Sequence, residues 1–294
     1  MTEFLQTLTS GIALGSLYAV LALGFVIVAR ASGILNLAQG SFVVLGAYLA
    51  YALIHQAGLP FWAGVIVAMA AVALFTVLLE AFVLHRVRDH FAALLITFGV
   101  TIAVAPVVTG IWPGDSLNLG DPWALNVLRI GGIGITARDA TLIPITAGIL
   151  LAFFLFFRYT RIGLSLRATA IDSEAAMAQG VSTRFVYGIS WGIAGALGAF
   201  GGVVLSTTVG GGVRPGLEVY AFLALPVIIL GGLESPLGAV VGGLVIGVVQ
   251  QFAVSLVPES WGSGFSEVVP YLVMLAILLI RPAGLFGRRE VRRA

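Results

Sequence analysis

The sequence predicts an all-α protein that crosses a membrane repeatedly, as a polytopic helix bundle with about eight or nine transmembrane spans. Hydrophobic residues make up 60% of the chain and charged residues only 10%, whereas soluble domains carry about 25% charged residues. Apolar stretches of roughly 20 residues, the length that crosses a bilayer, recur along the whole chain. The one long charged interval, 158–184, must lie outside the hydrocarbon, and we expect residues 1–294 to form a single transmembrane domain.

The apolar stretches predict nine helices. The second and seventh are short or interrupted, so eight full spans with one re-entrant segment is the alternative arrangement. Between the fourth and fifth, the interval 112–137 is rich in Pro, Gly, Asp and Asn, which mark turns and loops. The predicted spans are Gly11–Ala29, Leu37–Leu53, Phe61–Leu84, Phe91–Ile111, Arg138–Phe157, Phe185–Thr208, Val219–Leu230, Leu237–Val257 and Val268–Ile280.

The composition excludes several kinds of chemistry. The chain has no cysteine, so it has no disulfide, thiolate metal site or cysteine nucleophile. All 15 basic residues are arginine, and without lysine the chain cannot contain the Gly-Lys-Ser/Thr sequence of a Walker loop. The histidines His55, His85 and His90 show no metal-ligand spacing. We therefore expect no enzyme activity, no bound metal and no cofactor in this chain.

Arginine placement predicts the orientation, because basic loops stay on the cytoplasmic side. In the nine-span arrangement, twelve arginines fall on the side of the interval 158–184 and of the C-terminus, and three on the other. The C-terminus is then cytoplasmic, while the N-terminus and the loop 112–137 lie outside. This arrangement also accounts for the pI of about 9.2 without a nucleic-acid partner. The twelve are Arg30, Arg86, Arg88, Arg158, Arg161, Arg167, Arg184, Arg281, Arg288, Arg289, Arg292 and Arg293; the three are Arg129, Arg138 and Arg214.

Pairs of glycines four residues apart occur in three of the predicted spans. In lipid, small residues on one helical face let two helix backbones approach closely. The pattern therefore predicts a compact bundle, in which these contacts serve either static packing or a sliding motion of the helices. The pairs are Gly11/Gly15, Gly188/Gly192, Gly198/Gly202, Gly238/Gly242 and Gly243/Gly247.

Polar residues stand at the entrance of the second predicted span, where Asn36, Gln39 and Gly40 precede an apolar run. Such groups are costly at membrane depth unless they face protein or a water-filled path. Gly33 and Gly40 would let the helix break and free its backbone groups for a ligand, as in the broken helices of transporters. The alternative is a helix cap with an amide bond between helices. Both interpretations remain open, and these three residues are our candidates for a substrate path.

Glu80 is the only acidic residue within the third predicted span, a turn or two from Arg86. We expect a local pair between these two side chains, and a gate or relay is the alternative. Gln250 and Gln251 in the eighth span are expected to form hydrogen bonds between helices.

The charged interval contains a predicted short helix, Ile171–Gly180 (IDSEAAMAQG). Asp172 or Ser173 is its expected N-cap, Glu174 lies in the first turn, and Gly180 is a natural C-terminal stop. A helix this short is not stable alone in water, so it must pack on the bundle or in the groove of a partner. Its alanines, which leave little bulk on the surface, are Ala175, Ala176 and Ala178.

The pattern Glu174-Ala175-Ala176, with Gly180 four residues on, resembles the EAA loop of ABC importer permeases. In that family this element is the coupling helix, which docks on the ATPase subunit. The resemblance thus implies a coupling role for Arg167, Asp172, Glu174, Ala175, Ala176 and Gly180. Three further stretches are similar to the same family and follow its order: Gly15–Gly24 with Leu35–Tyr51, then Arg161–Ala168, then Gly231–Gly247 with Arg281–Gly287.

Over most of its length the chain is similar to the shorter of the two permeases in branched-chain amino acid ABC importers. The resemblance implies a multi-pass protein of the bacterial inner membrane that forms a heterodimer with a second, related permease. Two cytoplasmic ATPases would bind the ATP, and a periplasmic or lipid-anchored binding protein would deliver leucine, isoleucine or valine.

One motif departs from that family. Many members have Asn-x-Ala-His-Gly-Glu where this chain has Asn36-Leu37-Ala38-Gln39-Gly40-Ser41. Gln39 and Ser41 keep the polarity but remove the titratable pair, so import of urea or short amides on the same scaffold is an alternative. A second alternative is a secondary transporter or channel without an ATPase. Such proteins usually carry acidic residues or histidines within the membrane, and Glu80 is the candidate here.

Overall fold

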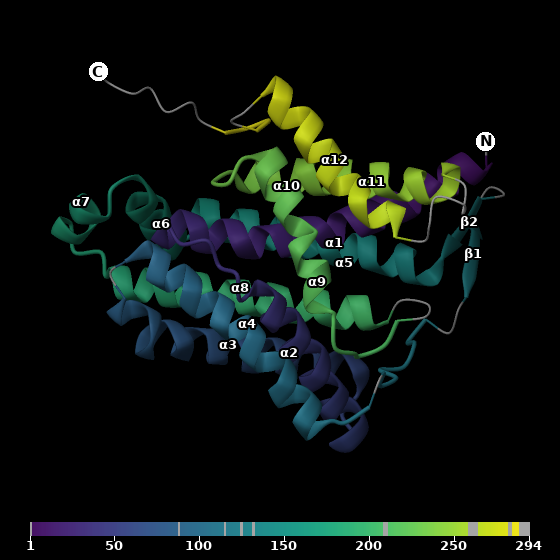
Figure 1. The fold of residues 1–294 in the computed structure, drawn as a ribbon, viewed down its shortest axis with the longest axis horizontal. Coiled ribbons are helices and arrows are strands. Elements are labelled where there is room, and N and C mark those ends of the chain that lie inside the picture. Colours follow the sequence, from purple (N-terminus) through teal and green to yellow (C-terminus); the bar gives the residue numbers. More distant parts are fainter. Residues whose placement is uncertain are drawn as a thin grey trace. The chain divides into compact units, whose positions relative to one another are not determined.

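The computed structural model describes residues 2–87, 89–114, 116–123, 126–130, 133–207, 211–257, 264–281 and 284–287. Its contacts divide the chain into two compact units that alternate along the sequence. Unit 1 comprises Met1–Val26, Trp123–Ile149 and Leu223–Ala294, and unit 2 comprises Ile27–Pro122 and Leu150–Phe222. Two long helices, α1 (Thr2–Ser32) and α5 (Ala137–Tyr159), contribute residues to both units (Figure 1). Arg88 and the four arginines after Gly287, used above to predict orientation, lie outside the described residues.

Unit 1 combines the N-terminal parts of α1 and α5 with three C-terminal helices, α10 (Ala224–Gly231), α11 (Pro236–Leu256) and α12 (Phe265–Ile280). Helix α11 packs against both α10 and α12. Its start follows from the sequence, because the Ser235 side chain accepts a hydrogen bond from the backbone N–H of Gly238, and a proline at the first position needs no N–H. After α12 the chain returns to α10, where the N–H of Leu285 donates to the Leu230 carbonyl at 2.7 Å.

Unit 2 is organised around α8 (Thr183–Ser206), which packs against α2 (Gln39–Tyr51) and α3 (Phe61–Phe82). Helix α2 also contacts α4 (His90–Ile111) and α9 (Glu218–Phe222). A π-helical segment, Ala52–Gln56, continues α2, and a 3-10 turn, Leu84–Arg86, follows α3. The remaining two helices are α6 (Arg161–Ile171) and α7 (Ser173–Ala178).

Each of the nine predicted spans coincides with helix in the structure. Among the described residues, six helical segments are long and apolar enough to cross a membrane: Thr2–Ser32, Phe61–Arg86, His90–Ile111, Ala137–Tyr159, Thr183–Ser206 and Pro236–Leu256. The predicted second and seventh spans are indeed short, the seventh being divided into α9 and α10. In the apolar stretches of α3, α4 and α5 only 28%, 22% and 17% of residues are buried, against 83% in α1 and α8. The first three therefore present apolar surface outward, whereas most residues of α1 and of α8 are buried.

Several of the paired glycines lie where two helices pack closely. In unit 1, a Cβ atom on Gly243 of α11 would lie 2.7 Å from the backbone nitrogen of Ala19 and 2.8 Å from the carbonyl oxygen of Gly15 in α1. In unit 2, a Cβ atom on Gly198 of α8 would lie 2.8 Å from Cβ of Phe42 in α2. Side chains at these positions would separate the helices, so the predicted close packing is confirmed.

The structure is mostly helical, as predicted, and adds one feature that the sequence analysis did not predict. Two short strands, β1 (Val127–Ile130) and β2 (Ile133–Thr136), pair antiparallel within the loop 112–137, with Val127 opposite Thr136. The turn-forming residues of this loop hid a run of β-branched residues on either side of two glycines, a pattern that favours a hairpin.

Candidate functional site

Helix α7 is held at both ends by its own sequence. The Asp172 side chain accepts hydrogen bonds from the backbone N–H groups of Glu174 and Ala175 at 3.0 and 2.9 Å. At the other end Gly180 has a φ of +84°, its N–H donates to the Met177 carbonyl at 2.9 Å, and the N–H of Val181 donates to the Ala176 carbonyl at 3.1 Å. These two bonds form the Schellman motif that ends helices at a left-handed glycine. The predicted N-cap and stop are confirmed, although the helix is shorter than the segment 171–180.

The charged interval contains a second helix that the sequence reasoning missed. Helix α6 precedes α7, and the two meet at Asp172, which ends α6 and caps α7. Arg167 of α6 donates hydrogen bonds to the carbonyls of Phe157 and Arg158 at the end of α5, and its guanidinium lies 5.7 Å from the Phe157 ring centroid. Arg167 therefore fastens α6 to α5, and Figure 1 shows α6 and α7 together beyond the end of α8.

The surface of α7 mixes small and apolar residues. Ala176 is buried and packs inward, whereas Glu174, Ala175 and Gly180 are exposed. Around them the Ile171 side chain is 81% exposed and that of Met177 is 50% exposed. A Cβ atom on Gly180 would meet no atom within 4 Å. Helix α7 therefore has hydrogen-bonded ends and a partly apolar surface of small side chains, which suits contact with another protein.

The entrance of α2 is a closed hydrogen-bond network. The side-chain amide of Gln39 donates to the Ala194 carbonyl of α8 at 3.1 Å and accepts from Nδ2 of Asn36 at 3.2 Å. Asn36 also accepts from the N–H of Ala38 at 3.0 Å. Both side chains are fully buried, and a Cβ atom on Gly40 would lie 2.9 Å from Cβ of Glu218. In this state Gln39 forms the interhelical bond of the second interpretation, whereas the N-cap of α2, Ala38, has no side-chain cap hydrogen bond.

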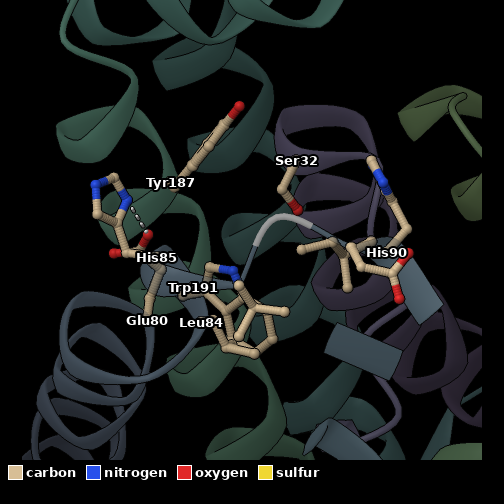
Figure 2. A pocket seen from close by; sticks show the side chains of 10 residues that line it. Ser32, Glu80, Leu84, His85, His90, Tyr187 and Trp191 are labelled. Carbon is tan, nitrogen blue, oxygen red and sulfur yellow. Dashed lines mark ion pairs between the residues drawn. The ribbon is translucent and has the colours of Figure 1, made fainter. Parts of the chain in front are cut away.

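Glu80 forms a local pair, but its partner is His85 and not the predicted Arg86. The carboxylate oxygen Oε1 lies 3.3 Å from Nδ1 of His85 (Figure 2). Helix α3 ends at Phe82, and the 3-10 turn that follows brings His85 back over the last turn while Arg86 is exposed.

The pair lines a pocket of about 210 Å³ within unit 2, formed by the ends of α1, α3, α4 and α8 with their connecting turns. Sequence reasoning missed its other members on α8, Tyr187 and Trp191, which are one helical turn apart. Their aromatic character alone is typical of any buried helix. A second, polar pocket of about 310 Å³ lies where the loop around Asn118 meets the end of α8.

The two glutamines Gln250 and Gln251, both expected to bond between helices, differ in their environments. Gln250 is buried, and its Oε1 accepts a hydrogen bond from the hydroxyl of Tyr18 at 2.8 Å, which joins α11 to α1 within unit 1. Gln251 is half-buried. Within the described ranges, no group of three or more His, Cys, Asp or Glu residues is placed to hold a metal ion.

Comparison with known proteins shows the family. Residues 7–278 match the family described as "Branched-chain amino acid transport system / permease component". The chain is 28% identical to the "High-affinity branched-chain amino acid transport system permease protein LivH" of Salmonella typhimurium, over 99% of this chain and 97% of that protein. It is 26% identical to the corresponding permease BraD of Pseudomonas aeruginosa, over 99% and 98% of the two chains.

A more distant relative is the probable LivH of Methanocaldococcus jannaschii, 26% identical over 95% of this chain and 91% of that one. Among solved structures, PsaBC from Streptococcus pneumoniae in complex with Fab is similar with a TM-score of 0.53 and 17% identity, covering 94% of this chain and 89% of that chain. This likeness concerns the fold alone. The family match spans nearly the whole chain, and the chain therefore belongs to the permease components of branched-chain amino acid transport systems.

Proposed function

We propose that this chain is the permease subunit of an ATP-driven ABC importer for leucine, isoleucine and valine, and that α7 is its coupling helix. The single observation that carries the coupling role is the pre-formed α7, which is capped by Asp172 and Gly180 and exposes Met177, next to the exposed Ile171 at the end of α6. The cargo follows from relatives whose names specify branched-chain amino acids and which align along nearly all of this chain.

In the proposed topology all nine helical segments take part in the membrane domain. Six are long enough to cross, and α2 with its π-helical extension, α9 with α10, and α12 supply the shorter elements. The C-terminus and α7 face the cytoplasm, and the N-terminus and the hairpin β1–β2 face outward. The support is the excess of arginines on the side of α7.

Coupling by α7 rests on its stiffness and on its exposed surface. Met177 and Ile171 belong to a segment outside the long apolar helices, so lipid does not cover them, and an apolar side chain in water favours burial against a protein. The Asp172 side chain fixes the N-terminal end of α7, and backbone hydrogen bonds fix its C-terminal end. Arg167 holds α6 on the end of α5. A displacement of α7 by a bound ATPase would therefore be transmitted to α5 and to the adjoining α8.

The proposed assembly contains a second, related permease, two cytoplasmic ATPases and an external binding protein. ATP would be bound by the ATPases alone, because this chain lacks the lysine that a Walker loop needs. Asn36, Gln39 and Gly40 remain the candidate path residues. Their network closes the entrance of α2 in the present state, and lining the path would require that α2 and α8 separate there.

The competing proposals differ in cargo or in energy source. Urea and short amides stay possible cargoes because Gln39 and Ser41 replace a His and a Glu found in many family members. An ATP-independent transporter would need an ion-coupling group, and Glu80 is engaged by His85. The family match and the named relatives favour the ATP-driven importer of branched-chain amino acids.

The test is uptake by proteoliposomes that contain the complete complex and its binding protein. Radiolabelled leucine should accumulate only when ATP is present in the compartment that the ATPase subunits face. Urea or acetamide should not accumulate. The variant Glu174→Arg should assemble poorly with the ATPases and lose uptake, whereas Glu3→Arg, a charge reversal at an exposed residue of α1, should behave as wild type. Accumulation of leucine without ATP, or full uptake by Glu174→Arg, would contradict the proposal.

A further inference from the structure

The pocket beside Glu80 has walls of several chemical kinds. It is lined by Ser32 and Ile34 after α1, by residues between α3 and α4, and by Tyr187 and Trp191 of α8. All of them belong to unit 2. The volume of about 210 Å³ is large for a site that holds only one or two waters. The pocket lies at the end of the helices where Arg30, Arg86 and Arg184 occur, the end that we propose to be cytoplasmic.

One side of the pocket carries a buried carboxylate with spare capacity. Glu80 is 2% exposed, and its Oε1 is engaged by His85 at 3.3 Å. Within the described part of the chain, its second oxygen, Oε2, has no hydrogen bond. An ionised carboxylate accepts up to about four hydrogen bonds, so Glu80 can take a further donor, and a cationic one most strongly.

The adjoining wall carries polar groups without partners. Trp191 is 1% exposed, and among the described residues its indole N–H donates to no acceptor; Figure 2 shows the indole nitrogen on the side of Ser32 and Tyr187. The Tyr187 hydroxyl likewise has no partner in the described residues. A ligand with a hydrogen-bond acceptor would give the Trp191 N–H a partner.

Two features complete the site. The Ser32 hydroxyl donates to the Val28 carbonyl at 2.8 Å, which leaves its oxygen lone pairs available as an acceptor. The apolar side chains of Ile34, Leu84 and Val87 also line the pocket. The pocket thus combines the Glu80 carboxylate, the Trp191 indole N–H and an aliphatic wall, and Asp89, His85 and His90 also line it.

We propose that this pocket binds a small aliphatic amino acid as its zwitterion. The ammonium group would donate to Oε2 of Glu80, the carboxylate would accept from the indole N–H of Trp191, and the side chain would lie against Ile34, Leu84 and Val87. The identity of the amino acid as a branched-chain one rests on the proposed function. The site itself is a second binding site, which the external binding protein does not serve.

The location gives the site a consequence for transport. Tyr187 and Trp191 stand in the first turns of α8, which begins at Thr183, three residues after Gly180. An amino acid bound there would tie α8 to the end of α3 through Glu80. Imported amino acid accumulating in the cytoplasm would therefore oppose movement of α8 and slow further import.

The experiment measures binding of radiolabelled leucine to the complete permease–ATPase complex in nanodiscs, without the binding protein. Saturable binding at one leucine per copy of this chain is expected. The variants Glu80→Gln and Trp191→Phe should each weaken leucine binding by about tenfold or more. Glu80→Gln removes the negative charge that faces the ammonium group, and Trp191→Phe removes a hydrogen-bond donor. Ile34→Ala, which shortens the aliphatic wall, serves as a third variant should either of the others lower the melting temperature of the complex. Matched controls outside the pocket are Glu267→Gln, Trp62→Phe and Ile66→Ala, which should bind leucine as wild type.

The outcomes separate this inference from the proposed function. If ATP-driven leucine uptake proceeds with the binding protein but the complex alone binds no leucine, the site is refuted and the function stands. If leucine is neither taken up nor bound, the proposed cargo is wrong and the inference falls with it. Unchanged binding in all three pocket variants would place the site elsewhere. Competition of leucine with phosphatidylethanolamine, tested against discs of phosphatidylcholine alone, would identify a lipid-headgroup site and overturn the proposal.

Discussion

The stop of α7 offers a perturbation that separates backbone strain from steric block. Gly180 adopts a φ of +84° with open space where a Cβ atom would be. Alanine at this position fits sterically but pays about 1–2 kcal/mol for the left-handed conformation, whereas asparagine tolerates it better. If α7 is marginally stable on its own, as its length implies, that cost lowers the ratio of formed to unformed helix about 5- to 30-fold.

The assay is ATP-dependent leucine uptake together with ATPase co-purification, for Gly180→Ala, Gly180→Asn and wild type. We expect Gly180→Ala to insert normally, with an unchanged melting temperature of the membrane domain, and to lose most uptake. Gly180→Asn should retain a clearly larger share. Equal loss in the two variants would show that any side chain obstructs the contact. Full uptake by Gly180→Ala would show that the Schellman end of α7 is irrelevant to coupling.

Two further predictions concern the helix contacts. Gly243→Ala places a methyl group against the α1 backbone at Gly15 and should destabilise the permease by about 1–3 kcal/mol, measured as a lower melting temperature in detergent. Gly148→Ala, with no atom within 4 Å of the added Cβ, is the control and should not lower the melting temperature. Equal melting temperatures of the two variants would contradict the close packing of α11 on α1. Gln39→Ala removes the bond to the Ala194 carbonyl and leaves buried polar groups unpaired, for about 1–3 kcal/mol; a stable Gln39→Ala protein with lost uptake would instead favour a path role over a structural one.

The sequence predicts best what depends on neighbouring residues. The cap at Asp172 and the stop at Gly180 are confirmed because both are decided within one turn of helix. The partner of Glu80 was predicted wrongly, since the choice between His85 and Arg86 depends on where α3 ends and on the 3-10 turn that follows. No hydrophobicity pattern reveals such a turn.

Features assembled from distant segments escape sequence reasoning altogether. The pocket joins Ser32, Glu80 and Trp191, which lie more than 40 residues apart and are individually unremarkable. Helix α6 was not predicted, and its Arg167, which the sequence analysis counted toward membrane orientation, binds the carbonyls at the end of α5. The hairpin at Val127–Thr136 was hidden among turn-forming residues.

The most direct test of coupling through α7 uses the absence of cysteine from this chain. In the purified complex, the single Met177→Cys variant is treated with a short bifunctional cross-linker that joins this cysteine to a reactive side chain of the ATPase. Met177→Cys should link to an ATPase subunit. The yield of this link should change between the nucleotide-free and ATP-bound states. Ser255→Cys, at the C-terminal end of α11, is the matched control and should not link to an ATPase subunit. Absence of any link from Met177→Cys in an assembled, ATP-hydrolysing complex would contradict the assignment of α7 as the coupling helix.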